Sequence, residues 1–263
     1  MSVVAEQRVL FGLRIDAVTL DESVAIAERA LAKRERLLIG VVNAAKVVKL
    51  KADGYLRESL LDCDLLLADG QSVVWASRLL GRPLPQRVTG IDLFESLLDL
   101  AHRRGHRVFL LGARGEVLSD LERVIAHRWP GVEIAGRRDG YFTEAEAAQV
   151  AAQIAESGAD MLFLGMTTPK KEIFLGTYGD SLGVPVLHGV GGSFDVLAGL
   201  TRRAPERWQR TGMEWAYRVL QEPRRLWRRY LVTNVAFVVL LASERVHRRP
   251  PYQFSTTGGK HHG

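Results

Sequence analysis

The fold is decided by residues 107–165, which read RVFLLGARGEVLSDLERVIAHRWPGVEIAGRRDGYFTEAEAAQVAAQIAESGADMLFLG. Short apolar runs alternate here with amphipathic patterns of helical period. The expected order is strand 107–111, helix 116–128, strand 132–135, helix 144–156 and strand 161–164. Thr143 precedes the second helix as an N-cap residue. Strands that are joined through helices in this way form parallel sheets covered on both faces.

The same alternation extends outward over residues 1–200. Further strands are expected at 9–13, 37–42, 65–68 and 184–188, and further helices at 22–36, after the N-cap Asp21, and at 91–104. The sequence therefore predicts an α/β fold, a mostly parallel Rossmann-like sheet with helices on both faces. Such sheets bind ligands outside the carboxyl ends of their strands. We expect those ends to bring together Asn43, Asp69-Gly70, Gly112, Gly165 and residues 189–192.

The composition narrows the class of protein. The chain has 263 residues, 47% hydrophobic and 25% charged, which excludes a disordered, collagen-like or coiled-coil chain. A single cysteine, Cys63, excludes an intrachain disulfide and a multi-cysteine metal site, and it fits a reducing, cytoplasmic compartment. The N-terminus shows no signal-peptide pattern, and no apolar stretch reaches the length that we expect of a membrane span.

Positive charge is concentrated near the C-terminus. Residues 202–249 hold twelve arginines, no lysine and four glutamates, a net charge of +8, whereas residues 1–201 carry a net charge of −3. This asymmetry points to a polyanionic partner, which could be nucleic acid, anionic lipid or a phosphorylated ligand.

The C-terminal segment also changes in pattern. Two helices rich in Trp and Arg are expected at 202–221 and 223–245, and residues 230–243 form an uncharged run that suits a membrane interface. The expected organisation is an α/β catalytic domain over 1–200, a membrane-associating helical appendage over 201–249 and a disordered tail over 250–263.

Two motifs have both a chemical and a purely structural interpretation. Asp69-Gly70 follows a strand, so Asp69 could act as a general base on a hydroxyl, although capping a helix is the commoner role of aspartate there. The turn GVGGSFD at 189–195 could bind a diphosphate through backbone N–H groups, or it could be a tight turn without a ligand.

Other motifs are weaker. Residues 112–115 follow a strand but lack the G-x-G-x-x-G spacing, which disfavours a nicotinamide cofactor. Lys170 and Lys171 stand near a helix start, where they oppose the helix dipole; a ligand would justify them, and ordinary surface lysines are the alternative.

Several segments, taken in order, resemble one family. The matching pieces are VN at 42–43, DG at 69–70, RVTGID at 87–92, GYF at 140–142, PKKE at 169–172, GVGGSFDVLAG at 189–199, RAP at 203–205, EWAYR at 214–218 and EPRR at 222–225. Together they run from about residue 10 to about residue 245 and resemble the WecG/TagA/CpsF family of bacterial glycosyltransferases.

The resemblance implies an inverting, metal-independent transferase without a cofactor. Such an enzyme moves a sugar from a UDP-sugar to a sugar carried on undecaprenyl diphosphate, in cell-surface polysaccharide synthesis. N-acetylmannosamine, its uronic acid or another hexose is the expected donor sugar. The resemblance also implies a peripheral position on the anionic inner face of the bacterial plasma membrane and no nucleic-acid partner, and it allows a homo-oligomer.

Residue roles follow from position in these motifs. Asp69 matches the catalytic base. The residues that the resemblance assigns to substrate binding are Asn43, Gly70, Arg87, Asp92, Lys171, Glu172, Gly191, Gly192 and Asp195. Arg218, Arg225 and Arg228 match arginines of an appendage that closes over the active site and binds the lipid diphosphate.

Two positions depart from the family pattern. Val41 stands where the family often has Thr, and Lys171 stands where it usually has Gln. Because Lys171 adds a positive charge, we expect a donor or acceptor sugar with a carboxylate. Two alternatives from other classes stay open at this point: a Rossmann-type nucleotide-cofactor enzyme, and a nucleic-acid-binding protein that uses the arginine-rich helices.

Overall fold

The computed structural model describes residues 6–252. Residues 1–5 and 253–263, which include most of the expected tail, lie outside the described part, as do the side chains of Arg210, Arg218, Arg225 and Arg229. The strands are β1 (Gln7–Leu10), β2 (Leu13–Asp16), β3 (Leu37–Val42), β4 (Leu65–Ala68), β5 (Arg107–Gly112), β6 (Glu133–Arg138), β7 (Met161–Gly165) and β8 (Val186–Gly189).

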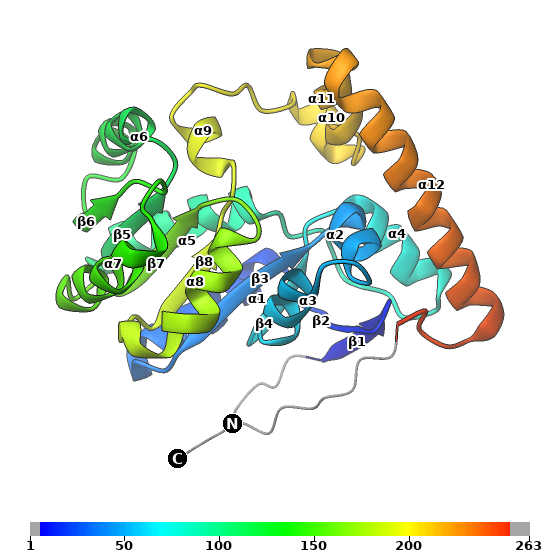
Figure 1. Cartoon of the computed structure of the whole chain (residues 1–263), viewed down its shortest axis with the longest axis horizontal. Helices are drawn as coiled ribbons and strands as arrows, with labels where there is room; N and C mark the ends of the chain where they lie inside the picture. The colour runs from blue at the N-terminus through cyan, green and yellow to red at the C-terminus, as the bar shows by residue number, and fades with distance from the viewer. Residues whose placement is uncertain (1–5, 253–263) are drawn as a thin grey trace.

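The helices are α1 (Leu20–Lys33), α2 (Ala44–Lys49), α3 (Gly54–Leu61), α4 (Gln71–Leu79), α5 (Gly90–Arg104), α6 (Gly115–Arg128), α7 (Glu144–Glu156), α8 (Lys170–Tyr178), η1 (Gly179–Leu182), α9 (Ser193–Leu197), α10 (Glu206–Arg210), α11 (Glu214–Gln221) and α12 (Pro223–His247). Figure 1 shows α10, α11 and α12 gathered at one side of the α/β part of the molecule.

The main sheet confirms the predicted fold class. Its six strands run in the order β4-β3-β8-β7-β5-β6, and every neighbouring pair is parallel. Helices α1, α5, α6 and α9 pack on one face, and α7 and α8 pack on the other. A further cluster beside β4 joins the β1–β2 hairpin, α2, α3, α4 and α12. All parallel strands therefore end at one edge, where the sequence places its candidate residues.

The N-terminal strand expected at 9–13 is wrong. Phe11 and Gly12 have φ angles of 54° and 82° and form the two-residue turn of an antiparallel hairpin, β1–β2. Turns of this kind need positive φ at both central residues, which Phe rarely adopts. The apolar run around this turn hid the hairpin, because Leu10, Phe11 and Leu13 are all buried.

Helix boundaries differ from expectation in two places. α1 begins after Thr19 rather than Asp21, because Thr19 and Glu22 form a capping box. The helix expected at 202–221 divides into α10 and α11 at Gly212, whose φ is 70°. A Cβ atom at Gly212 would lie 2.3 Å from the Cγ of Gln71, so only glycine lets this turn pack on the start of α4.

α12 is longer than the sequence pattern suggests. Over Leu226–His247 its length and mean hydropathy, 1.2, reach those of a membrane span, contrary to the expectation that no stretch would. Its inner side nevertheless packs on the hairpin: the Phe237 ring lies 5.1 Å from the Phe11 ring, and the buried Glu244 accepts from the Phe11 N–H at 2.8 Å. The inner side of α12 is therefore part of the folded protein.

Candidate active site

Asp69 lies at the carboxyl end of β4 and is held from two sides. Its own N–H donates to Val42 O at 2.9 Å, which continues the pairing of β3 and β4. Its Oδ2 accepts from Nδ2 of Asn43, and its Oδ1 accepts from the N–H of Gly90, both at 3.3 Å. The helix N-cap of α4 is Gly70, so the interpretation of Asp69 as a cap is wrong. The carboxylate instead joins β3, β4 and the N-terminus of α5.

Asn43 and Gly70 set the position of that carboxylate. Asn43 is the N-cap of α2: its Oδ1 accepts from the Lys46 N–H at 3.2 Å, so its Nδ2 points to Asp69. A Cβ atom at Gly70 would lie 3.1 Å from the Cβ of Asn43, which explains why glycine follows Asp69. The structure thus brings together Asn43, Asp69 and Gly70, three residues of the predicted site.

His188 supports the site from below and was not predicted. It is fully buried on β8, with Nε2 3.2 Å from Gly90 O and Nδ1 3.4 Å from Ile39 O. Burial lowers the pKa of His188 to about 4, so the ring is neutral near pH 7. A neutral ring has a single N–H and can donate to only one of these carbonyl oxygens. The shorter contact is with Gly90 O, and Gly90 is the residue that donates to Asp69.

A second unpredicted residue, Lys46, contributes positive charge beneath the site. Its Nζ donates to Val41 O at 2.7 Å. Burial, and then the charge of Lys171, lowers the pKa of Lys46 to about 8, while Asp69 and Glu172 act in the opposite direction. Lys46 stands three residues after the N-cap Asn43, which is an ordinary position for a lysine in a helix. The sequence therefore gave no sign that Lys46 belongs to the site.

Lys171 and Glu172 form an ion pair of their own. Lys171 Nζ lies 3.1 Å from Glu172 Oε1, and the two side chains are only 11% and 2% exposed. Thr168 Oγ1 also donates to Glu172 Oε1 at 3.1 Å. The positive charge of Lys171 is thus balanced by Glu172 rather than left free for a ligand. The prediction of a sugar with a carboxylate assumed a free charge on Lys171, so this ion pair weighs against it.

A small cavity lies between this ion pair and α3. It measures about 20 Å³, and its lining includes Lys46, Cys63, Lys171, Glu172 and Gly189. Glu172 Oε2 is buried against it and has no hydrogen-bond partner among residues 6–252 as the structure describes them. That volume suits one water molecule and no sugar. Burial raises the pKa of the Cys63 thiol to about 12, which makes it unreactive.

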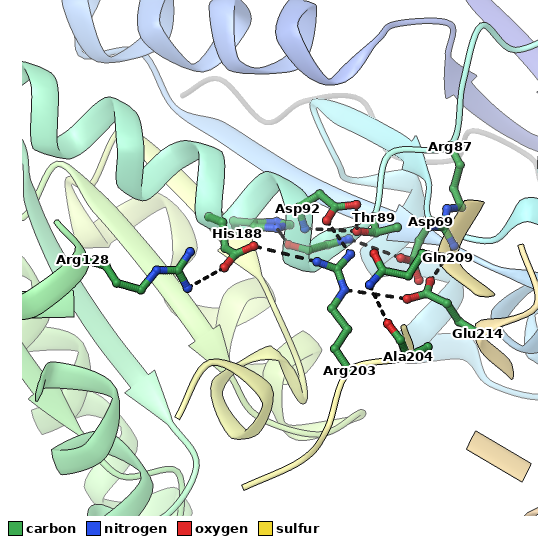
Figure 2. Close-up of polar contacts among 12 residues, drawn as sticks. Asp69, Arg87, Thr89, Asp92, Arg128, His188, Arg203, Ala204, Gln209 and Glu214 are labelled. Atoms are coloured by element: carbon green, nitrogen blue, oxygen red, sulfur yellow. Dashed lines mark hydrogen bonds and ion pairs between the residues drawn. The ribbon is translucent and has the colours of Figure 1, made fainter. Parts of the chain in front are cut away.

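Charged groups of the appendage reach the same edge of the sheet. Arg87, whose side chain is half-buried, donates to Glu214 Oε2 at 2.6 Å. Arg203 bonds to Asp92, and Asp92 in turn accepts from Thr89 Oγ1 at 2.6 Å. Figure 2 shows these side chains converging beside Asp69. Asp92 therefore binds an arginine of the chain itself rather than pointing out toward a ligand.

The glycine-rich turn lies at the end of β8, the strand that pairs with β3. Val190 and Gly191 donate to Leu164 O at 3.0 and 3.2 Å, and Gly191 has a φ of 53°. A Cβ atom at Gly191 or Gly192 would meet nothing within 4 Å, so the turn faces open space. Helix α9, which contains Asp195, has only five residues and gives little helix dipole.

The remaining predicted residues and groups are placed as follows. Arg228 is exposed on α12, and the side chains of Arg218 and Arg225 lie outside the described part of the chain. Among the side chains that the structure describes, no group of three or more His, Cys, Asp or Glu is arranged to hold a metal ion. Arg203 and Glu214 belong to the RAP and EWAYR motifs, but the sequence analysis gave them no role, because no local pattern indicates that they pair.

Comparison with known proteins agrees with this arrangement. Residues 8–251 match the profile of the family described as glycosyl transferase WecG/TagA/CpsF. The chain is 40% identical over 193 residues to the N-acetylglucosaminyldiphosphoundecaprenol N-acetyl-beta-D-mannosaminyltransferase of Bacillus spizizenii, a match that covers 73% of this chain and 74% of that relative. The resemblance drawn from the motifs is confirmed: the chain belongs to the WecG/TagA/CpsF family of glycosyltransferases.

Proposed function

We propose that this glycosyltransferase moves a sugar from a UDP-sugar to N-acetylglucosamine carried on undecaprenyl diphosphate. The acceptor is inferred from the name of the Bacillus spizizenii relative, to which the chain is 40% identical. The observation that carries the proposal is the Asp69 carboxylate, held at the ligand-binding edge of a parallel sheet by Asn43 and Gly90. A glycosyltransferase that inverts the anomeric configuration needs such a base to activate the acceptor hydroxyl group.

The proposed reaction is a single displacement. An acceptor hydroxyl gives its proton to the Asp69 carboxylate as its oxygen forms a bond to C1 of the donor sugar. The bond between C1 and the phosphate oxygen breaks, and UDP leaves with that electron pair. Attack opposite the leaving group inverts the anomeric configuration.

The two hydrogen bonds to Asp69 orient its carboxylate for this step. Asn43 and Gly90 hold the two oxygens, while Gly70 removes the side chain that would crowd Asn43. Orientation of a base toward a reacting hydroxyl supplies part of the rate. His188 acts through Gly90 and is a positioning residue, since it touches neither Asp69 nor the ligand edge directly.

In the proposed reaction, protein groups rather than a metal ion stabilise the negative charge of the leaving diphosphate. The backbone N–H group of Gly192, in the open turn, is suited to a phosphate oxygen, whereas that of Gly191 already donates to Leu164 O. Arginines of the appendage, Arg218, Arg225 and Arg228, are proposed for the lipid diphosphate. Arginine suits this role because its planar guanidinium binds phosphate oxygens in pairs.

For the donor, we propose a neutral hexosamine rather than a uronic acid. The Lys171–Glu172 pair is buried and balanced in charge, so a sugar carboxylate would gain no free cation there. Lys171→Gln leaves Glu172 without that cation and should lower activity with every donor by a similar factor. A change in the ratio of the rates with UDP-N-acetylmannosamine and its uronic acid would instead support the carboxylate sugar.

Family membership decides against the two alternatives from other classes, the nucleotide-cofactor enzyme and the nucleic-acid-binding protein.

The stereochemistry of the product tests the proposed mechanism. Nuclear magnetic resonance of the product, made with a short-chain polyprenyl diphosphate acceptor, should show the anomeric configuration opposite to that of the donor. Retention of configuration would contradict the single displacement by Asp69.

A further inference from the structure

Glu214 lies between two arginines at the edge of the site. Its Oε2 accepts from Arg87 at 2.6 Å, and its Oε1 lies 3.8 Å from Nε of Arg203. The Arg87 and Arg203 side chains are 13% and 23% exposed, and Glu214 is 24% exposed. The two cations come from the α4–α5 connection and the start of the appendage, and the anion comes from α11. Figure 2 shows the three groups facing one another.

Arg203 lies near several carboxylates but does not form hydrogen bonds with all of its N–H groups. It bonds to Asp92, and its NH1 lies 3.9 Å from Glu95, which is already paired with Arg128 at 2.9 Å. Its Nε is buried and makes no hydrogen bond in the part of the chain that the structure describes. A buried guanidinium N–H without a partner is costly, and such a group is satisfied best by an oxygen acceptor.

A single carboxylate is a poor match for two guanidinium groups. It has two oxygens, and here only one of them is within hydrogen-bond distance of an arginine. A diphosphate has more oxygens and more negative charge, and arginine binds phosphate oxygens in pairs. Such a ligand can therefore satisfy both Arg87 and the unused Nε of Arg203, which Glu214 leaves without a hydrogen bond.

We propose that Arg87 and Arg203 form a clamp for a substrate diphosphate, and that Glu214 occupies this clamp until the diphosphate displaces it. This inference rests on the proposed function, and it adds Arg203 as a substrate-binding residue and Glu214 as a residue that competes with substrate. The ligand chemistry is a diphosphate ester, which the nucleotide sugar and the polyprenyl acceptor both carry.

The exchange also couples ligand binding to the appendage. Glu214 is the first residue of α11, and the turn before it, at Gly212, packs on Gln71 two residues after Asp69. A diphosphate that displaces Glu214 removes one ion pair that holds α11 against the site. The appendage then becomes free to shift as substrate binds.

The test compares two substitutions that should act in opposite directions. Affinities for UDP, UMP and farnesyl diphosphate are measured by calorimetry on the full chain. With the probe that the clamp holds, Arg203→Gln should weaken binding at least about 10-fold, because charge-assisted bonds to phosphate are lost. Glu214→Gln should tighten binding of that probe about 3- to 10-fold, because the competing carboxylate is gone. If UDP is that ligand, the preference for UDP over UMP should shrink in Arg203→Gln and grow in Glu214→Gln.

Two matched controls each remove one charge from an exposed side chain on a helix outside the site. Arg123→Gln, on α6, and Glu156→Gln, at the end of α7, should bind every probe as the wild type does. Because Glu214→Gln should gain affinity, a folding defect in Arg203→Gln does not leave the proposal untested.

The probes separate the sources of the diphosphate. Opposite shifts with UDP alone assign the clamp to the donor, and opposite shifts with farnesyl diphosphate alone assign it to the acceptor. Unchanged affinity of Glu214→Gln for both diphosphates, or weaker binding, would overturn the clamp while leaving the proposed function intact. Failure of the wild type to bind either diphosphate would overturn the proposed function and the clamp together.

Discussion

At the scale of single residues, Asp69 has the surroundings of a positioned base. Its two carboxylate oxygens each accept one N–H group, from Asn43 and from Gly90, so the side chain is fixed while its lone pairs toward the open edge stay available. An amide at this position keeps the shape and loses the ability to take a proton.

Asp69→Asn is therefore expected to keep the fold and to lose at least ~100-fold in kcat, the lower range for one general base. Steady-state release of UDP measures the loss, and circular dichroism checks the fold. Asp120→Asn, at a half-buried position of α6 that is paired with Arg123, is the matched control and should retain wild-type turnover. Near-normal turnover of Asp69→Asn would remove Asp69 from the role of base.

His188 makes stability depend on pH. Its pKa is about 4 in the folded chain, against about 6.5 when unfolded, because the ring is buried and Lys171 and Lys46 add positive charge nearby. Below pH 6.5 the unfolded chain takes up a proton that the folded chain refuses, so stability falls as the pH drops toward 4. From pH 7 to pH 5 this contribution amounts to about 2 kcal/mol.

The variant His188→Gln isolates this effect, because glutamine can donate to Gly90 O but does not titrate. Urea unfolding at pH 7 and pH 5 should show that the variant loses about 2 kcal/mol less than the wild type over this interval. Equal losses for both proteins would show that His188 does not carry the acid sensitivity.

Residues at strand ends could be predicted from the sequence, whereas their long-range partners could not. Asn43 and Asp69 follow apolar runs, and parallel strands end at one edge, so their meeting follows from topology. Glu214 and Arg87 are 127 positions apart in the chain, and neither carries a local pattern that predicts the other. The burial of Lys171 with Glu172 was missed for a similar reason, since two lysines in sequence resemble an exposed surface.

At the scale of secondary-structure elements, long periodic segments were predicted well and short ones were missed. Helices α5, α6 and α7 agree with expectation within one residue at each end, because each has a clear apolar stripe. The sequence patterns gave no bounds for the shorter helices α2, α3, α4, α8 and α9, although they indicated a helix start near Lys170 and a short helix after the glycine-rich turn. These helices have five to nine residues each and follow strand ends or loops. Their helical form is fixed by caps and packing rather than by period, as Asn43 shows for α2.

α12 belongs to the folded core through its inner side, although the sequence suggested a separate appendage. Phe237→Ala should lower the free energy of unfolding by about 3–5 kcal/mol, because it leaves a cavity beside Phe11. Urea unfolding measures this loss. The neighbouring Val238 is 60% exposed, so Val238→Ala is the matched control and should change stability by less than about 0.5 kcal/mol. Equal, small effects would mean that α12 does not pack on the hairpin.

At the scale of the whole molecule, α12 has an outer side that no other part of the described chain covers. Trp227, Leu231, Val235 and Val239 recur at intervals of four and are all more than half exposed, and Arg228 is exposed beside them. Apolar residues with neighbouring arginines suit the surface of an anionic membrane. The outer side of α12 is therefore the surface through which we expect the enzyme to reach its lipid-linked acceptor.

Replacing Leu231, Val235 and Val239 together with serine should abolish sedimentation with vesicles that contain anionic lipid. The fold should persist, because these side chains are more than half exposed, whereas deletion of residues 202–263 would also expose the hairpin. A matched variant, Val9→Ser with Leu61→Ser, removes exposed apolar side chains elsewhere and should still bind. Unchanged binding of the triple variant would show that this side of α12 is not the membrane contact.

We expect the enzyme to transfer a sugar from a UDP-sugar to an acceptor linked to a lipid diphosphate. UDP release by the purified protein, with a panel of UDP-sugars and a short-chain polyprenyl diphosphate N-acetylglucosamine acceptor, tests it most directly. We expect release that depends on the acceptor, is fast with one donor, and is unchanged by EDTA. Release that stops with EDTA would contradict the metal-independent mechanism, and an absence of release with every donor would contradict the proposed substrates.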